Sequence, residues 1–428
     1  MSRRDPQAAG GWDKAAAERH LLGLERFGMR FGLDRMRRLT SALSRPQDRF
    51  RAVHVVGSNG KSSTTRMIAA LLEREGLRTG AYLSPHLVSF TERIRVGERD
   101  IDGADFAAAV ARAARAAELV ERSAPADERV TQFELLTGAA LSELGRRGVD
   151  VAVLEAGLGG RWDATNVVGA PVVVLTNVGL EHQRWLGPTV SDIAQEKLAV
   201  LGDGAALVVG PLHVDAEAEA ERAAARHGAP IIRAHADDAD PVLAALGGFQ
   251  RDNFAVARAA ATTLLGRPLS AEAVREAAAA TRVPGRLERV ADEPPTYHDG
   301  AHNAEGMRAL SASLPEVTGA RPLVAVVSVL DDKDAAAMLG ALLPYCASVV
   351  LTASAHPRAL PPGTLASLAR QLLGAAAPPA ELVANPRAAQ RRARELAAAT
   401  GASVLVTGSL YLLADLRRPV AAGQGSRI

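Results

Sequence analysis

The sequence predicts an α/β fold in which parallel strands are covered by helices. Short apolar runs alternate with longer amphipathic stretches along most of the 428 residues. Runs such as 149–154 (VDVAVL) and 171–175 (PVVVL) are almost continuously apolar, which is typical of central parallel strands buried on both faces. Strands that alternate with helices in this way indicate a doubly wound sheet.

The first part of the chain supplies the elements of one such sheet. Residues 51–56 (RAVHVV) are the first clear strand, and 62–75 is predicted to be a helix because its apolar residues share one face. Further strands are expected at 79–83, 149–154, 171–177 and 206–209.

A second series of elements follows the segment 281–285 (TRVPG), whose Pro-Gly pair is a plausible linker. Strands are expected at 296–298, 323–329, 348–352 and 403–407. We therefore predict a larger domain at 1–283 and a smaller one at 284–428.

Composition argues against several classes of partner. The 50 basic and 48 acidic side chains nearly balance, so no broad basic surface for nucleic acid is expected. Apolar runs such as 323–327 are far shorter than the roughly 18 residues of a membrane span. The first residues lack the apolar core of a signal peptide. Cys346 is the only cysteine, which fits a reducing compartment. We expect a cytoplasmic protein without nucleic-acid or membrane partners.

A glycine-rich segment follows the first strand. It consists of Gly57, Ser58, Asn59, Gly60, Lys61 and Ser62, a shortened GxxGK[ST] pattern placed between a strand and a helix. Glycines let backbone N–H groups converge on phosphate oxygens, and the helix N-terminus favours negative charge. The lysine can reach terminal phosphates and the serine hydroxyl can approach magnesium. The alternative is a turn that binds nothing. We predict a P-loop-containing domain.

Three hard-ligand candidates follow strands of the same predicted sheet. Ser84, Glu155 and His182 come after the strands that begin near 79, 149 and 171, and ligands of open α/β sheets bind beyond the carboxyl ends of strands. Oxygen ligands suit magnesium, so serine and glutamate fit better than histidine. Singly, the three also fit a turn residue, a cap and a structural histidine.

Lys197 interrupts an apolar helical face formed by Ile193, Ala194, Val200 and Leu201. Burying an unpaired charge is costly, so this lysine needs a partner or must extend its ammonium group to solvent. A salt bridge with a nearby carboxylate and a role in the site both remain open.

Several motifs together resemble one family. They are FGMRFGLDRM (27–36), GSNGKSS (57–63), AYLSPHLVSFTERIRV (81–96), VLEAGLGGRWDATNV (153–167), GLEHQRWLGPT (179–189), IAQEKLAV (193–200), RDNFAVA (251–257), PGRLE (284–288), YHDGAHN (297–303), LDDKD (330–334) and VTGSLYL (406–412). Their order resembles the folylpolyglutamate synthase and dihydrofolate synthase branch of the Mur ligases, over roughly 27–412. The resemblance implies an ATP- and pterin-binding P-loop ATPase domain with a parallel sheet, followed by a smaller Rossmann-like glutamate ligase domain.

The resemblance also implies residue roles. ATP would be bound by Gly57, Ser58, Asn59, Gly60, Lys61, Ser62, Asn253, Arg286 and Asp299; Mg²⁺ by Ser84, Glu155, His182 and a carbamylated Lys197. Lys61, His182 and Lys197 would be catalytic. The pterin or glutamate substrates would contact Arg30, Phe31, Gly32, Thr131, Gln132, Phe133, Glu134, Trp162, Asp163, Ala164 and His302. Carbamylation has a physical rationale, because magnesium repels an ammonium but binds the anionic carbamate.

The activity implied is an ATP-dependent ligase that adds L-glutamate to dihydropteroate and/or reduced folates through an acyl phosphate. One alternative is folylpolyglutamate synthase activity only. Another is a different Mur-type amide ligase, although the phosphate loop begins at residue 57 and leaves little room for an additional N-terminal domain. A nucleotide-binding regulator that does not ligate is a fourth possibility. Trp162 stands where the family commonly has leucine, and Glu181 where it has aspartate. The family resemblance implies a monomer.

Overall fold

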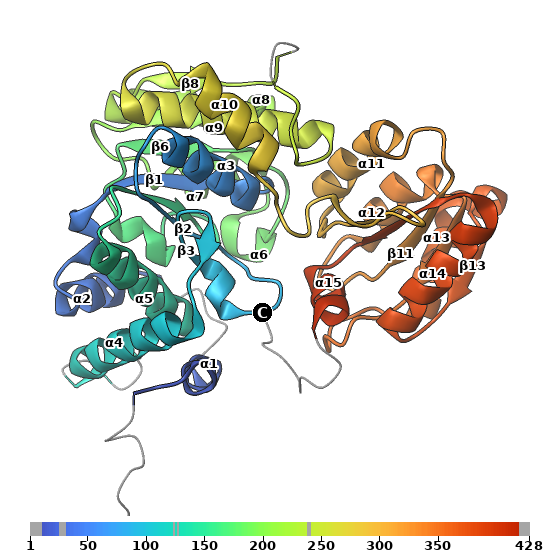
Figure 1. The fold of residues 1–428 in the computed structure, drawn as a ribbon, viewed down its shortest axis with the longest axis horizontal. Coiled ribbons are helices and arrows are strands. Elements are labelled where there is room, and N and C mark those ends of the chain that lie inside the picture. Colours follow the sequence, from blue (N-terminus) through green and yellow to red (C-terminus); the bar gives the residue numbers. More distant parts are fainter. Residues whose placement is uncertain (1–10, 25–30, 123–124, 126–127, 238–240, 419–428) are drawn as a thin grey trace, which may run out of the picture. The chain divides into compact units, whose positions relative to one another are not determined.

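The chain forms two α/β units. The computed structural model describes residues 11–24, 31–122, 125, 128–237 and 241–418. One unit comprises Met1–Asp237 with Asn253–Ala277, and the other comprises Asp238–Asp252 with Ala278–Ile428. Within each unit, helices pack around a central sheet (Figure 1).

The first unit contains an eight-stranded sheet with the order β4-β3-β2-β5-β1-β6-β7-β8. Its strands are β1 (Arg51–Val56), β2 (Thr79–Tyr82), β3 (Ile94–Val96), β4 (Arg99–Asp100), β5 (Val151–Glu155), β6 (Val172–Leu175), β7 (Ala206–Val209) and β8 (Ile231–Arg233). Pairing is parallel from β2 to β8 and antiparallel at β3 and β4. Val55 pairs with Glu155, so β1 and β5 end at the same edge of the sheet.

The helices of this part of the chain are α1 (Lys14–Gly23), α2 (Asp34–Ala42), α3 (Lys61–Arg74), α4 (Gly103–Glu121), α5 (Gln132–Arg147), α6 (Gln183–Leu186), α7 (Val190–Leu198), α8 (Val214–His227), α9 (Gly248–Leu265) and α10 (Ala271–Ala280). Two buried apolar clusters share one face of the sheet. Ala52 of β1 belongs to the cluster with α4 and α5, and Val56 belongs to the cluster with α7 and α8. His54 lies between them, because alternate residues of a strand point to the same face.

The second unit contains a six-stranded sheet with the order β13-β12-β11-β14-β10-β9. Its strands are β9 (Glu288–Ala291), β10 (Thr296–His298), β11 (Leu323–Val327), β12 (Ser348–Leu351), β13 (Ala380–Leu382) and β14 (Ser403–Thr407). Its helices include α11 (Ala304–Thr318), α12 (Ala335–Leu342), α13 (Pro362–Leu373), α14 (Pro386–Thr400) and α15 (Leu410–Arg417). Apart from the antiparallel edge strand β9, the pairing is parallel.

The predicted α/β class and each predicted strand are confirmed, with boundaries that differ by a few residues. The short strands β3, β4, β8, β9 and β13 were not predicted. All of them lie at or next to a sheet edge. Edge strands of two to four residues are too short and too exposed to carry a continuous apolar run.

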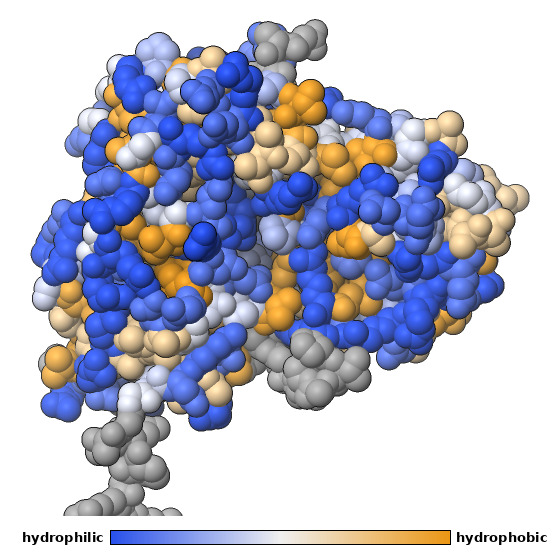
Figure 2. Space-filling view, viewed as in Figure 1, coloured by the Kyte–Doolittle hydropathy of each residue, from blue (hydrophilic) through white to orange (hydrophobic). Residues whose placement is uncertain are grey.

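Hydrophilic residues dominate the face of the molecule seen in Figure 2, and apolar residues lie between them in separate groups. Within the described residues, no helix is both long enough and apolar enough to span a bilayer.

Candidate active site

The glycine-rich segment forms a tight loop between β1 and α3, as predicted. Gly57 has φ of +149° and Gly60 has φ of +81°, conformations that other residues rarely adopt. A Cβ atom on Gly57 would lie 1.9 Å from Thr176 Oγ1, and one on Gly60 would lie 2.3 Å from Asn253 Oδ1. Both glycines are therefore required by backbone conformation and by close approach of neighbours.

Residues after β6 hold this loop, and the sequence analysis did not single them out. Asn177 Oδ1 accepts a hydrogen bond from the amide of Asn59 at 2.8 Å, and Thr176 Oγ1 donates to the carbonyl of Asn59 at 2.6 Å. The available signal was their position directly after a buried strand. What the sequence alone did not provide was that β6 is the neighbour of β1.

Asn253 reaches the loop from α9. Its amide oxygen lies close to Gly60 and accepts a hydrogen bond of 3.5 Å from Thr64 Oγ1. The structure thus brings this predicted ATP-binding residue to the phosphate loop within the first unit.

The Lys61 ammonium group bends back over its own loop. It donates to the carbonyl oxygens of Gly57 at 2.8 Å and of Ser58 at 3.1 Å. Both of these hydrogen-bond partners are neutral carbonyl oxygens of the loop itself. An anion placed there could replace these bonds at little cost.

Ser62, Ser84 and Glu155 meet at the carboxyl ends of β2 and β5. Glu155 is 1% exposed. One of its carboxylate oxygens accepts from Ser62 Oγ at 2.8 Å, and the other accepts from the Ser84 amide at 3.0 Å. The hydroxyl of Ser84 accepts from Arg93 Nη1 at 3.3 Å. Three oxygen-bearing side chains that suit Mg²⁺ are therefore adjacent.

His182 is the N-cap residue of α6. It is exposed, has φ of +47° and precedes α6. Among the residues that the structure describes, no group of three or more histidine, cysteine, aspartate or glutamate side chains is arranged to hold a metal ion. The oxygen donors around Glu155 fit magnesium.

Lys197 forms a buried ion pair. The residue is 1% exposed, and its ammonium group donates to Glu181 Oε1 and to the Gly57 carbonyl, both at 2.8 Å. Burial lowers the pKa of Lys197, and Glu181 opposes that shift. Burial by itself would raise the pKa of Glu181, but the attraction of Lys197 and Lys61 brings it well below its usual value.

This geometry matches the salt-bridge interpretation of Lys197. The expected carbamylation finds no support, because the buried ammonium group already has a buried carboxylate as its counterion. Through Gly57, the pair also contacts the phosphate loop.

The predicted pterin-binding segment at the start of α5 uses most of its polar groups internally. Thr131 and Glu134 form a capping box with each other. Glu134 also forms a buried ion pair with Arg35 at 3.1 Å, and Gln132 Nε2 donates to the carbonyl of Leu21 at 2.7 Å. These residues hold the end of the helix in place.

Three of the predicted pterin contacts, Phe31, Phe133 and Trp162, are aromatic residues of the first unit. Phe31 is 65% exposed and Trp162 is 37% exposed, and their rings meet edge to face with centroids 6.2 Å apart. Phe133 packs against Tyr82 and closely approaches Gly157. Two exposed aromatic rings in contact can pack against a flat heterocycle.

The remaining residues predicted for this region differ in accessibility. Gly32, next to Phe31, has φ of +109°, and Arg30 lies outside the described residues. Asp163 and Ala164 are 5% and 3% exposed. The Asp163 carboxylate accepts hydrogen bonds from backbone amides around it.

Three predicted residues lie together in the second unit: Arg286 precedes β9, and Asp299 and His302 follow β10. The Asp299 carboxylate accepts from the amides of Leu287 and Ala301, both at 2.7 Å, and its burial raises its pKa. Arg286 Nη1 would be 2.4 Å from a Cβ atom on Gly300. His302 Nδ1 lies 2.8 Å from the Gly300 carbonyl oxygen.

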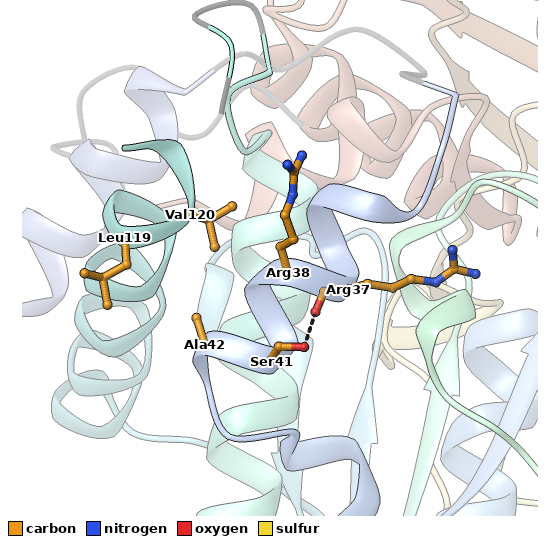
Figure 3. Close-up of a pocket in the computed structure, with 6 residues that line it drawn as sticks. All are labelled: Arg37, Arg38, Ser41, Ala42, Leu119 and Val120. Carbon is orange, nitrogen blue, oxygen red and sulfur yellow. Dashed lines mark hydrogen bonds between the residues drawn. The ribbon is translucent and has the colours of Figure 1, made fainter. Parts of the chain in front are cut away.

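A pocket elsewhere in the first unit contains none of these residues. It has a volume of about 380 Å³ and lies between α2 and α4 (Figure 3). It is lined by Arg37, Arg38, Ser41, Ala42, Leu119 and Val120. Arg37 pairs with Asp34 and Arg38 with Glu128, so both cations have counterions. We do not assign the activity to this pocket.

Comparisons with known proteins agree with the sequence motifs. Residues 55–240 match the Mur ligase middle domain, and residues 285–410 match the Mur ligase, glutamate ligase domain. The chain is 33% identical over 413 residues to a folylpolyglutamate synthase of Lacticaseibacillus casei, covering 90% of this chain and 94% of that protein. It is 35% identical over 381 residues to a dihydrofolate synthase/folylpolyglutamate synthase of Mycobacterium tuberculosis, covering 80% and 78%.

A solved structure is also similar. It is that of Mycobacterium tuberculosis folylpolyglutamate synthase complexed with ADP and AMPPCP. The TM-score is 0.86 at 32% identity, and the match covers 95% of this chain and 98% of the other.

Proposed function

The chain belongs to the Mur ligase family, and from that premise we propose that it is an ATP-dependent ligase adding L-glutamate to dihydropteroate and/or reduced folates. The observation that carries the proposal is the phosphate loop beside the oxygen cluster of Ser62, Ser84 and Glu155. The similar structure binds ADP and AMPPCP, which supports ATP as the co-substrate.

A carboxylate must be activated before an amine can displace one of its oxygens. Transfer of the γ-phosphoryl group of ATP to the acceptor carboxylate gives an acyl phosphate and ADP. The glutamate amine then attacks the acyl carbon, and the tetrahedral intermediate loses phosphate to leave the amide. Positioning and charge neutralisation account for most of such catalysis.

The phosphate loop would bind the ATP phosphates through Gly57, Ser58, Asn59, Gly60 and Ser62. Lys61 would exchange its two carbonyl contacts for phosphate oxygens and offset the charge that develops in transfer. We keep Asn253 as an ATP contact on the adenine side, as the family resemblance implies; its position beside Gly60 supports a contact with ATP.

Mg²⁺ would be held by Ser84 and Glu155, with Ser62 adjacent, and we retain His182 as a further candidate ligand and catalytic residue. When bound, the ion neutralises phosphate charge and orients the transferred group. The buried pair of Lys197 and Glu181 would hold the Gly57 end of the phosphate loop in place. For Lys197 we propose this role in preference to carbamylation.

Acceptor binding would involve the exposed rings of Phe31 and Trp162, and Phe133, which closely approaches Gly157, remains a further proposed contact. We propose that 1–283 is the ATP- and pterin-binding region and that 284–428 is the glutamate ligase region. In the second unit, Arg286 and Asp299 remain the proposed ATP contacts and His302 the proposed glutamate contact. A monomeric, cytoplasmic enzyme acting on small molecules fits these assignments.

Folylpolyglutamate synthase activity alone is the second candidate, since the relative from Lacticaseibacillus casei bears only that name. One experiment separates the candidates. Purified protein receives Mg-ATP, glutamate and either dihydropteroate or tetrahydrofolate, and the products are identified by mass spectrometry. Glutamate addition to both acceptors is expected for the bifunctional enzyme, and addition to tetrahydrofolate alone leaves the second candidate. Addition to neither would refute the folate assignment.

A further inference from the structure

A chain of buried hydrogen bonds connects the centre of the first sheet with the loop after β5. His54 Nε2 lies 2.7 Å from Thr165 Oγ1, and Thr165 Oγ1 donates to Asp163 Oδ1 at 2.5 Å. Asp163 Oδ2 then accepts from the amides of Gly157 and Leu158, both at 2.9 Å. The three side chains are at most 5% exposed.

The direction of each hydrogen bond follows from the chemistry of the groups. The Thr165 hydroxyl has one proton, which it gives to the carboxylate of Asp163. Its oxygen must therefore accept from His54, which places a proton on Nε2. Burial lowers the pKa of His54 to about 4, so the ring is neutral near pH 7 and its Nδ1 carries no proton.

Asp163 links this series of side-chain hydrogen bonds to the backbone. Its two oxygens accept from the amides of Gly157, Leu158 and Thr165 and from the Thr165 hydroxyl. These four donors match the approximately four lone-pair sites of a carboxylate. The loop between β5 and the 3-10 helix Ala164–Val167 is thus tied to one buried side chain.

This loop, residues 156–163 and called the held loop below, has different direct hydrogen-bond partners from the phosphate loop. It includes Trp162, whose exposed ring contacts Phe31. The phosphate loop is held instead by Thr176 and Asn177. Glu155, directly before the held loop, has separate contacts with serine residues.

The held loop also packs on α7, where the Arg161 amide donates to the Glu196 carbonyl at 2.9 Å, and Lys197 of α7 contacts Gly57. Trp162 belongs to the held loop itself, whereas the phosphate loop is reached only by way of α7 along this route. A change in these hydrogen bonds should therefore affect the aromatic pair more than the ATP phosphates.

We propose that Thr165 and His54 are positioning residues for the acceptor, acting through Asp163 on the loop that carries Trp162. This inference rests on the proposed function for the identity of the acceptor. A purely structural role would also make these residues important for stability, but it would not separate the acceptor from ATP. The test must therefore measure both substrates.

The decisive variant is Thr165→Val in the full chain, which keeps the shape of the side chain and removes its hydroxyl. Thr165→Ser restores the hydroxyl. Thr40→Val is the matched control, because Thr40 is a buried threonine of the same unit whose hydroxyl bonds only to carbonyl oxygens of its own helix. KM is measured for tetrahydrofolate and for ATP, together with amide hydrogen exchange at residues 157 and 158.

We expect Thr165→Val to raise the KM for tetrahydrofolate about tenfold, the effect of losing one hydrogen bond to a charged group. The KM for ATP should stay within about twofold, since the phosphate loop has other supports. Exchange at residues 157 and 158 should accelerate. Thr165→Ser should return all values toward those of the natural protein, and Thr40→Val should change none of them.

An unchanged tetrahydrofolate KM in folded Thr165→Val protein, or an equal rise in both KM values, would overturn the inference. Should this variant not fold, Thr165→Ala, which cannot overpack the site, is measured in the same way. If the natural protein ligates no pterin, the proposed function fails. In that case the exchange measurement still tests whether the hydrogen bonds from His54 to Asp163 hold the loop. Unchanged exchange in the variant would show that they do not.

Discussion

Replacing Lys197 by methionine tests the buried ion pair that adjoins the phosphate loop. The substitution keeps a similar volume and removes the charge, leaving the Glu181 carboxylate with its closest counterion gone. Breaking a buried pair from one side typically costs about 3–5 kcal/mol. The effect should fall toward the lower end of that range, because Lys61 also attracts Glu181. Lys197→Met should therefore lower the free energy of unfolding of the first unit by about 3 kcal/mol.

A double-mutant cycle gives the coupling directly. Lys197→Met, Glu181→Gln and the double variant are compared by urea unfolding at pH 7, monitored with a probe in the first unit. The double variant should be less destabilised than the sum of the single variants by about 2 kcal/mol, because neither charge then remains unpaired. Additive effects would refute the ion-pair interpretation.

The same position distinguishes the ion pair from carbamylation. Lys197→Arg keeps a cation that cannot form a carbamate, so activity that is retained in a stable Lys197→Arg protein favours the ion pair. A stable but inactive Lys197→Arg protein, together with an added carbon dioxide mass on the natural enzyme in Mg²⁺, would instead restore the carbamylation hypothesis.

Three other predictions concern separate parts of the molecule. Lys61→Ala should fold normally and lose activity by orders of magnitude, because it removes charge stabilisation at the transferred phosphoryl group; near-normal turnover would contradict the site. Glu155→Gln should raise the Mg²⁺ concentration needed for half-maximal activity about tenfold or more, whereas an unchanged Mg²⁺ dependence would exclude Glu155 as a ligand. Burial lowers the pKa of His54 from its ordinary value of 6.5 to about 4, so the unfolded chain binds more protons between these values. Stability should therefore rise with pH across that window and change little above it on account of this residue; His54→Gln should reduce this slope, and an unaltered slope would show that His54 does not titrate as inferred.

Much of the fold was predictable because its signals are local. The apolar runs of β1, β5 and β6 and the helix after the phosphate loop each reflect the burial of one short segment. The phosphate loop was recognisable for the same reason, since its glycines and Lys61 are consecutive in the chain. Glu155 and Ser84 could be placed near it because parallel strands end at a common edge.

The tertiary structure decided which groups these residues meet. Lys197 was identified as a buried cation in need of a partner, but the choice between a carboxylate and a metal depended on Glu181, which no periodicity places beside it. The series of hydrogen bonds from His54 through Thr165 to Asp163 was not predicted from the sequence. In the sequence, His54 is one residue of a largely apolar strand. Only the strand order, with β1 between β5 and β6, shows that it lies in the centre of the sheet. Local patterns determine which segments are buried, whereas a hydrogen bond between segments far apart in the sequence depends on strand order and register, which are set by packing of the whole unit.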